Sequence, residues 1–397
     1  MIPRAITGLG VVSTLGVGRE AFFAGLDAPT LLRDRKPTAV ETRDPVKYPN
    51  AAIAEVRDFD PAKYLGDKGL RTLDRLTKLL VVATRLAMVD AGLKKEGAFV
   101  GTSAERVGVV CSNAYGSLEA ITELDRVAVL EDARYINPAK FPNTVANSAS
   151  GYASIWEDLR ALNVAISDGN CGGLDAVACA DIYLETDRAD ALLVGGAEAS
   201  SEALYLAFQR LGVFEAGGYI GEGAALIAVE EMSHAKARGA TIYAEIIGVG
   251  NAFDAPKHEG QIIHASRDAV VRATRHALDD AGIQASEVDL VVSGHSALRP
   301  FDMAETAGIT EVLGADVPIA APKLILGETL GAGGAMAMAT ALAWFRGTAV
   351  SAIVRGTAPA PGALQTVLVT AMGYYGNATC VVLRSGRRPA DGPKGAR

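Results

Sequence analysis

Hydrophobic positions recur at helical spacing in two segments that lie far apart in the chain, residues 83–93 and 273–283. Seven of their eleven aligned positions are identical, and each segment ends near a glycine, Gly92 or Gly282. In both cases a polar turn and a short apolar run follow. The pattern therefore predicts the same unit twice, an amphipathic helix that ends at glycine and leads into a strand.

A second pair of segments repeats in the same order along the chain. Residues 218–228 and 373–383 each carry a glycine-rich turn that leads into an apolar run. Two pairs of similar segments in the same order favour a duplicated α/β chain, with halves at 1–240 and 241–388 related by a pseudo-twofold axis. The composition of residues 389–397 predicts a mobile tail. Strands are expected after the repeated helices, at residues 107–111 and 288–293, and buried central strands at residues 191–194, 225–229 and 288–292.

Composition narrows the class of protein. The chain has 397 residues, 49% of them hydrophobic, which is enough for a large buried core. Its net charge of −8 argues against a nucleic-acid-binding protein. Four widely spaced cysteines favour neither a disulfide framework nor a metal site. The absence of a secretory leader pattern or a membrane-length apolar run predicts a cytoplasmic protein with no membrane contact.

One of those cysteines, Cys171, lies where a strand-like segment breaks at small residues before a predicted helix, 176–187. At a helix N-terminus, unpaired N–H groups and the dipole favour thiolate, so Cys171 is a candidate nucleophile. The alternative is a small buried core residue, which is common for free cysteine.

Two further positions are candidates for chemistry. His295 follows the predicted strand 288–293, and the carboxyl ends of strands in open α/β sheets are where sites assemble. Lys323 and Glu328 bracket an apolar stretch before a glycine-rich helix start. Alternatively, Lys323 is a solvated loop charge and Glu328 an acid stabilised by a helix dipole.

These residues and several segments together resemble the β-ketoacyl synthases of the thiolase superfamily. The resemblance covers nearly the whole chain and includes residues 6–13, 59–65, 221–224, 238–243 and 373–377. It implies a thiolase-like fold with an αβαβα layered core. It also implies an acyltransferase that takes an acyl group onto a cysteine, decarboxylates malonyl carrier protein and joins the two units.

The resemblance assigns roles to the candidate residues. It implies Cys171 as nucleophile, His295 as the first catalytic histidine, and Lys323 with Glu305 as a supporting pair. At the second histidine position of the family this chain has Glu328. Both histidines are thought to donate hydrogen bonds to the enolate, whereas an ionised carboxylate only accepts. Glu328 is either protonated, or charged and paired with Lys323 or with His295.

The family's gating loop falls on residues 372–376, which begin at Met372. Tyr374 takes the place of the gating phenylalanine, whose backbone N–H joins that of the cysteine as an oxyanion hole. Basic side chains that fall on the family's carrier-protein surface, or alternatively form only a solvated basic face, are Lys68, Arg71, Arg75 and Arg210.

The resemblance further implies a dimer that joins at strand 164–167, either a homodimer or a heterodimer with another ketosynthase subunit. It implies no metal and no cofactor beyond the phosphopantetheine carried by the substrate. The sequence thus predicts a β-ketoacyl-synthase-like enzyme of fatty acid or polyketide biosynthesis. Two alternatives stay open: a non-decarboxylating acyltransferase in which Glu328 is a general base, and a partner subunit like the chain-length factors.

Overall fold

The structure, a computed structural model, describes residues 1–35, 40–49 and 51–386. The predicted mobile tail at 389–397 lies outside the described residues. The main sheet runs in the order β14-β13-β12-β15-β16-β11-β1-β10-β8-β6-β7, with β2 paired to β1. Its strands are β1 (Arg4–Ser13), β2 (Gly16–Val17), β6 (Val107–Ser112), β7 (Asn163–Ile166), β8 (Ala191–Glu198), β10 (Gly223–Glu231), β11 (Ala244–Phe253), β12 (Leu290–Val292), β13 (Ile319–Ala320), β14 (Ile353–Arg355), β15 (Thr366–Met372) and β16 (Asn377–Ser385).

Short strands outside this sheet are β3 (Ile53–Ala54) paired with β9 (Ile220–Gly221), and β4 (Lys94–Lys95) paired with β5 (Ala98–Phe99). The helices are α1 (Arg19–Asp27), α2 (Ala62–Leu65), α3 (Arg75–Asp90), α4 (Leu118–Val127), α5 (Ser148–Glu157), α6 (Gly172–Glu185), α7 (Glu202–Arg210), α8 (Met232–Ala237), α9 (Arg267–Ala281), α10 (Arg299–Leu313), α11 (Lys323–Leu326) and α12 (Gly333–Phe345).

The two halves of the sheet have the same topology. The order β7-β6-β8-β10-β1 in the first half corresponds to β13-β12-β15-β16-β11 in the second. In each half the first three strands are parallel, and the last two join them in antiparallel pairs. Antiparallel pairing of β1 with β11, from Arg4↔Ile246 to Ile6↔Ala244, joins the halves. The duplicated α/β architecture predicted from the repeats is confirmed.

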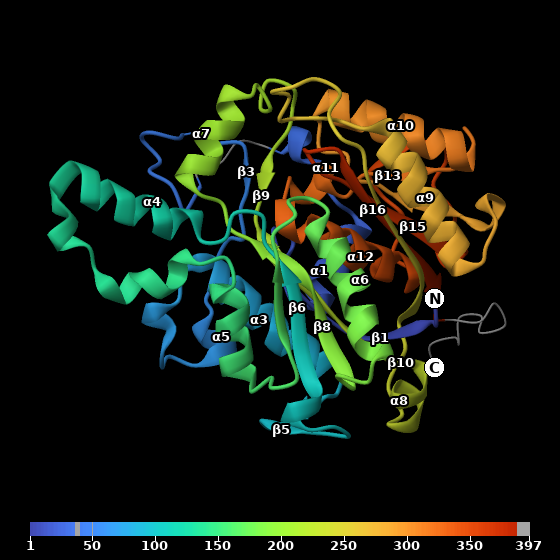
Figure 1. Ribbon diagram of the computed structural model, residues 1–397, viewed down its shortest axis with the longest axis horizontal. Coiled ribbons are helices and arrows are strands. Elements are labelled where there is room, and N and C mark those ends of the chain that lie inside the picture. The colour runs from blue at the N-terminus through green and yellow to red at the C-terminus, as the bar shows by residue number, and fades with distance from the viewer. Residues whose placement is uncertain (36–39, 50, 387–397) are drawn as a thin grey trace.

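Helices and sheet halves alternate in layers (Figure 1). One core cluster packs α3 and α5 against the first half of the sheet, and another packs α9 and α10 against the second. The largest cluster lies between the halves, around α6 and α12. Every residue of α12 is buried. This is the αβαβα arrangement expected for a thiolase-like fold.

The two repeated helices begin at side-chain caps. Asp74 accepts a hydrogen bond from the Thr77 N–H at 2.9 Å before α3, and Ser266 accepts one from the Ala269 N–H at 3.1 Å before α9. Such caps satisfy N–H groups that lack a partner within the helix. Helix α9 ends at Gly282, whose φ of 66° suits glycine.

The helix starts of the middle layer, α6 and α12, touch through glycines. A Cβ atom at Gly173 would lie 2.9 Å from the Ala335 nitrogen, and one at Gly334 would lie 3.0 Å from the Leu174 nitrogen. Only glycine permits backbones to approach so closely. The N-termini of a helix from each half therefore meet at one place.

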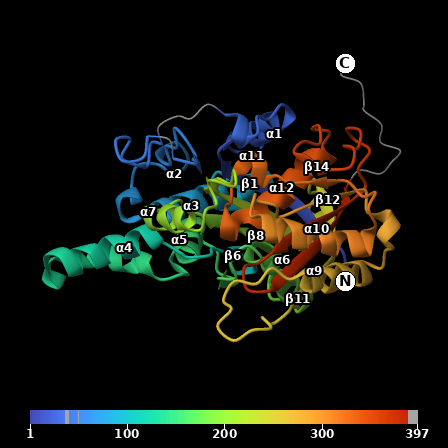
Figure 2. The same ribbon diagram turned by 90° about the horizontal axis from the view of Figure 1, so that it is seen from above.

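One arm extends away from the layered body. Helix α4 and the turns after it stand out in Figures 1 and 2. Large apolar side chains on this arm are mostly exposed, namely Val129, Leu130, Tyr135 and Phe141.

Candidate active site

Cys171 is the residue immediately before α6, and its carbonyl accepts the first hydrogen bonds of that helix. Its side chain is fully buried, and its thiol donates a hydrogen bond to the Ala371 carbonyl at the end of β15 (3.5 Å). The predicted position at a helix start is confirmed, although the helix begins at Gly172 and not at residue 176.

The ionisation of the thiol differs from the sequence expectation. Burial raises the pKa of the Cys171 thiol well above its ordinary value, and the Asp175 and Asp168 carboxyl groups raise it further. The expectation of a thiolate favoured by the helix N-terminus is therefore wrong for the resting site. Desolvation is the largest cause of the raised pKa, and the two nearby acids add to it.

These acids form a network below the thiol. Thr379 donates a hydrogen bond to Asp175 Oδ1 at 2.6 Å, and Asn377 Nδ2 lies 2.9 Å from both Asp168 oxygens. Burial, with a smaller contribution from Asp168, raises the pKa of Asp175 to about 7. Sequence reasoning missed this network, although an acid in the first turn of the nucleophile's helix was a visible signal.

His295 lies just beyond β12, as predicted. Its Nε2 atom is 3.1 Å from the Thr306 hydroxyl and 3.6 Å from Glu305 Oε2, both on α10. The turn after it is strained, because Ala297 has a φ of 70°. Asp302 stabilises that turn by accepting hydrogen bonds from the Ser296 and Ala297 N–H groups, each at 3.1 Å.

Glu328 is buried and held by donors. Its Oε2 lies 2.8 Å from Lys323 Nζ, and its Oε1 accepts a hydrogen bond from the Leu330 N–H at 2.9 Å. Its backbone N–H donates to the Tyr219 carbonyl, and its carbonyl accepts from the Gly221 N–H. Two donors to the carboxylate match an ionised acceptor. Of the three alternatives for Glu328, the structure shows pairing with Lys323.

The expected pair of Lys323 with Glu305 is wrong. Glu305 instead accepts hydrogen bonds from the Gly294 N–H at 2.9 Å and from the Thr370 hydroxyl at 2.5 Å. It therefore links the loop before His295 to β15. Lys323 is only five residues from Glu328, across one short turn of helix, and this local partner binds it.

A small cavity of about 10 Å³ is lined by Lys323 and by residues next to the other candidate side chains. Its lining includes Asn170 beside the nucleophile, Gly294 beside His295, and also Lys323 and Ala371. A larger, open cavity of about 410 Å³ lies over the start of α10, and Thr306, the hydrogen-bond partner of His295, lines it. The structure thus brings Cys171, His295, Lys323, Glu328 and Glu305 to one site.

The loop after β15 has two different faces. Met372 is buried in the core cluster of α9 and β16, on the outer side of the sheet. Tyr374 packs its ring edge-on against Phe301, with centroids 5.2 Å apart. Of the two predicted gating residues, only Tyr374 therefore has its side chain toward the site.

A third buried acid, Glu198, was not predicted. It ends β8 and accepts hydrogen bonds from the Ala114 N–H at 2.7 Å and the Gly331 N–H at 3.2 Å. Burial raises the pKa of Glu198 to about 8 despite these donors. An acid at the end of a wholly apolar strand was the signal in the sequence.

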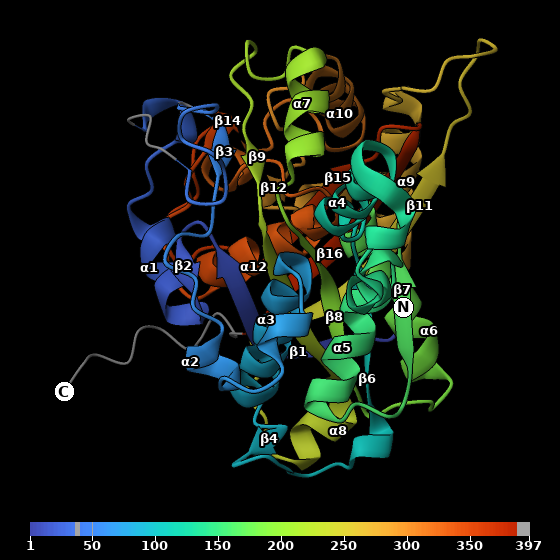
Figure 3. The ribbon, with the colours of Figure 1, turned by 90° about the vertical axis from the view of Figure 1, so that its left-hand side faces the viewer.

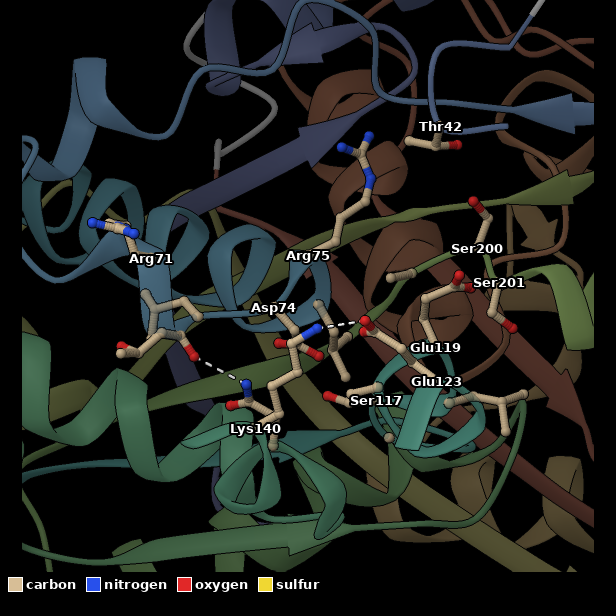
Figure 4. A pocket seen from close by; sticks show the side chains of 18 of the residues that line it. Thr42, Arg71, Asp74, Arg75, Ser117, Glu119, Glu123, Lys140, Ser200 and Ser201 are labelled. Carbon is tan, nitrogen blue, oxygen red and sulfur yellow. Dashed lines mark hydrogen bonds and ion pairs between the residues drawn. The ribbon is translucent and has the colours of Figure 1, made fainter. Parts of the chain in front are cut away.

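The predicted carrier-protein residues do not form one patch. Arg71 and Arg75 line a cleft of about 510 Å³, and Figure 4 shows their side chains pointing apart. Arg75 is bound by buried Glu222, with Nε 2.9 Å from Oε2. Lys68 and Arg210 are exposed outside the cleft lining. Arg71 is exposed at the cleft edge.

Among residues 1–35, 40–49 and 51–386, no cluster of three or more histidine, cysteine or acidic side chains is arranged to hold a metal ion. In the same part of the chain, no helix is both long and apolar enough to cross a bilayer.

The thiolase-like fold with a cysteine, a histidine and a lysine at one site defines a class, the acyltransferases that condense through a cysteine. Residues 3–235 match the family description "Beta-ketoacyl synthase, N-terminal domain", and residues 243–355 match "Beta-ketoacyl synthase, C-terminal domain". The chain belongs to the β-ketoacyl synthase family, and it is an acyltransferase.

Individual relatives agree with this assignment. The chain is 32% identical to 3-oxoacyl-[acyl-carrier-protein] synthase 2 of Coxiella burnetii, over 83% of each chain. It is 31% identical to the tetracenomycin polyketide synthase ketoacyl synthase beta subunit of Streptomyces glaucescens, over 97% of this chain and 99% of the relative. A β-ketoacyl synthase from Burkholderia phymatum superposes with a TM-score of 0.82 at 26% identity, covering 98% of this chain and all of the other.

Proposed function

We propose that this protein condenses an acyl group held on Cys171 with malonyl carrier protein, in fatty acid or polyketide biosynthesis. The observation that carries the proposal is a buried thiol at a helix start, in one site with His295 and a lysine–carboxylate pair. Relatives named as 3-oxoacyl-[acyl-carrier-protein] synthases support the substrate class. The comparisons do not favour either alternative function.

The chain's own groups account for the first step. The acyl thioester carbon accepts the sulfur of Cys171, and the carrier thiol leaves with the proton that the cysteine loses. Because burial raises the pKa of the Cys171 thiol, its proton moves as the new bond forms, and the departing carrier thiolate is its acceptor. We infer no cofactor besides the phosphopantetheine arm of the substrate.

Intact-mass spectrometry tests the proposal directly. Wild type is mixed with acyl carrier protein thioester and then with malonyl carrier protein. Cys171→Ala is the inactive variant, and Cys179→Ala, in the same helix and half-buried, is the matched control. We expect an acyl adduct on wild type and Cys179→Ala only, discharged as an extended β-ketoacyl product. An adduct that never elongates would instead support the acyltransferase alternative, and no adduct would support the partner-subunit alternative.

We further propose a carrier-protein surface around the exposed side chains of Lys68 and Arg71. Carrier proteins are acidic, and exposed cations at the edge of a cleft attract such partners. Arg75 is held by its ion pair with buried Glu222, so its effect on docking is expected to be indirect.

The dimer is proposed to form through β7. This strand is at the end of the main sheet and pairs only with β6 in the described part of the chain, so its outer edge is open. Figure 3 shows it between α5 and α6. On those helices Ile155 is 75% exposed and Ile182 is 61% exposed. An open strand edge flanked by apolar side chains suits a second ketosynthase subunit.

Light scattering of the purified chain separates the two kinds of dimer. A dimer that becomes a monomer on Ile182→Glu, and persists on Val89→Glu at an equally exposed site on α3, supports a homodimer. A wild-type monomer supports a heterodimer with another ketosynthase subunit.

A further inference from the structure

The hydroxyl of Tyr374 is buried and has no hydrogen-bond partner among the described residues. The residue is firmly positioned, because its ring packs on Phe301 and its carbonyl accepts a hydrogen bond from the His264 N–H at 2.8 Å. Burying a hydroxyl without a partner destabilises the native state. An exception of this kind in a site calls for a functional explanation.

The Tyr374 ring packs against the buried cluster that contains Leu330, and the Leu330 N–H donates a hydrogen bond to Glu328, so Tyr374 lies beside the catalytic site. Burial and the neighbouring Glu328 raise the pKa of Tyr374 well above its ordinary value, while Asn170 acts in the opposite direction. Tyr374 is therefore protonated at any working pH and is a hydrogen-bond donor. Glu328 already accepts from Lys323 and from the Leu330 N–H, and the Tyr374 hydroxyl is near enough to Glu328 and to Asn170 to interact with both without forming a well-aligned hydrogen bond to either.

The other donor of the site is partly occupied. His295 Nε2 faces Thr306 and Glu305 on α10, so the second ring nitrogen is the one left for a substrate oxygen. Glu328 offers no donor while it is ionised. The site therefore has an unused phenolic O–H close to the position where a second donor is required.

We propose that the Tyr374 hydroxyl donates a hydrogen bond to the thioester oxygen of the malonyl unit and to the enolate formed from it. The proposal rests on the function proposed above. As carbon dioxide leaves, the electron pair of the broken C–C bond moves onto that oxygen as an enolate. Tyr374 stabilises the charge without giving up its proton. The enolate carbon then attacks the acyl carbon, and Cys171 leaves as thiolate.

Tyr374→Phe removes only the hydroxyl and keeps the ring against Phe301. Tyr135→Phe, at a side chain that is 70% exposed on the arm after α4, is the control for the loss of a tyrosine hydroxyl. We expect acyl loading of Cys171 to be equal in all three proteins. Condensation, measured as β-ketoacyl product per minute, should fall about 100-fold in Tyr374→Phe, as when one oxyanion donor is removed. It should stay within twofold of wild type in Tyr135→Phe.

Stability gives a second signature. Because the native hydroxyl lacks a partner, the urea midpoint of Tyr374→Phe should equal or exceed that of wild type. A variant that is slower and also less stable would indicate a structural role and overturn the proposal. Full condensation by Tyr374→Phe would overturn this proposal alone, whereas a wild type that forms no product would overturn the proposed function and this inference with it.

Discussion

Replacing Lys323 by methionine isolates the electrostatic part of the Lys323–Glu328 pair. The lysine side chain is 9% exposed and the carboxylate 1%, and their charged atoms are 2.8 Å apart. Methionine is of similar length and fills the space beside Gly333, so packing changes little. Removing one partner of a buried pair costs about 3–5 kcal/mol. The Leu330 N–H stays bound to the carboxylate, so the lower end, about 3 kcal/mol, is expected.

Equilibrium urea unfolding followed by tryptophan fluorescence, to which Trp156 and fully buried Trp344 both contribute, measures this cost. All proteins are compared at one concentration, because subunit association adds to apparent stability. The matched control is the double variant Lys323→Met with Glu328→Met, which leaves no buried charge and should lose far less than the sum of the two single losses. A single variant that costs under about 1 kcal/mol, or a double variant with strictly additive losses, would refute the reasoning.

Three further predictions concern other charges. Because the pKa of folded Glu198 is about 8 against an ordinary 4.5, wild type should lose stability as pH rises from about 5 to 8, at up to about 1.4 kcal/mol per unit. Glu198→Gln should lack that loss, and parallel stability curves would contradict the assignment. Asp175→Asn removes one acid that raises the pKa of Cys171, so alkylation of the Cys171 thiol by iodoacetamide at pH 8 should become several-fold faster. The rate is measured by mass spectrometry, with Cys171→Ala as the control. A slower rate would contradict the effect assigned to Asp175. Arg71→Glu should raise KM for the carrier protein about tenfold. Arg75→Met should instead lower the free energy of unfolding in urea by about 3 kcal/mol, because it leaves Glu222 buried without its partner. If both variants changed KM and stability equally, the separate roles of a docking residue and a structural residue would be wrong.

The repeats in the sequence predicted the architecture because helix and strand periodicity is a local property. The helix that contains residues 83–93 and its copy at 273–283 became α3 and α9 at corresponding places in the two halves. Their N-terminal boundaries were not anticipated, since Asp74 and Ser266 cap them several residues before the repeated segments begin.

The sequence predicted which residues make up the site, but it did not predict all of the contacts between them. Cys171, His295 and Glu328 follow strands or precede helices, and the sheet topology brings such positions together. Which acid pairs with Lys323, and whether the thiol is ionised, depend on distances between side chains from different elements. Asp175 illustrates this limit, because its effect on Cys171 depends on burial and on Asp168, neither of which a motif encodes.

The meeting of α6 and α12 at Gly173 and Gly334 has a consequence for evolutionary change at this site. Each helix start carries about half a positive charge from its peptide groups, so the two together supply about one charge that no side-chain substitution removes. The positive potential of these helix starts comes from the backbone, so it persists when an acidic side chain is introduced nearby. This field acts on an anionic intermediate whichever side chain occupies position 328, so an acid such as Glu328 fits there without a change in the scaffold.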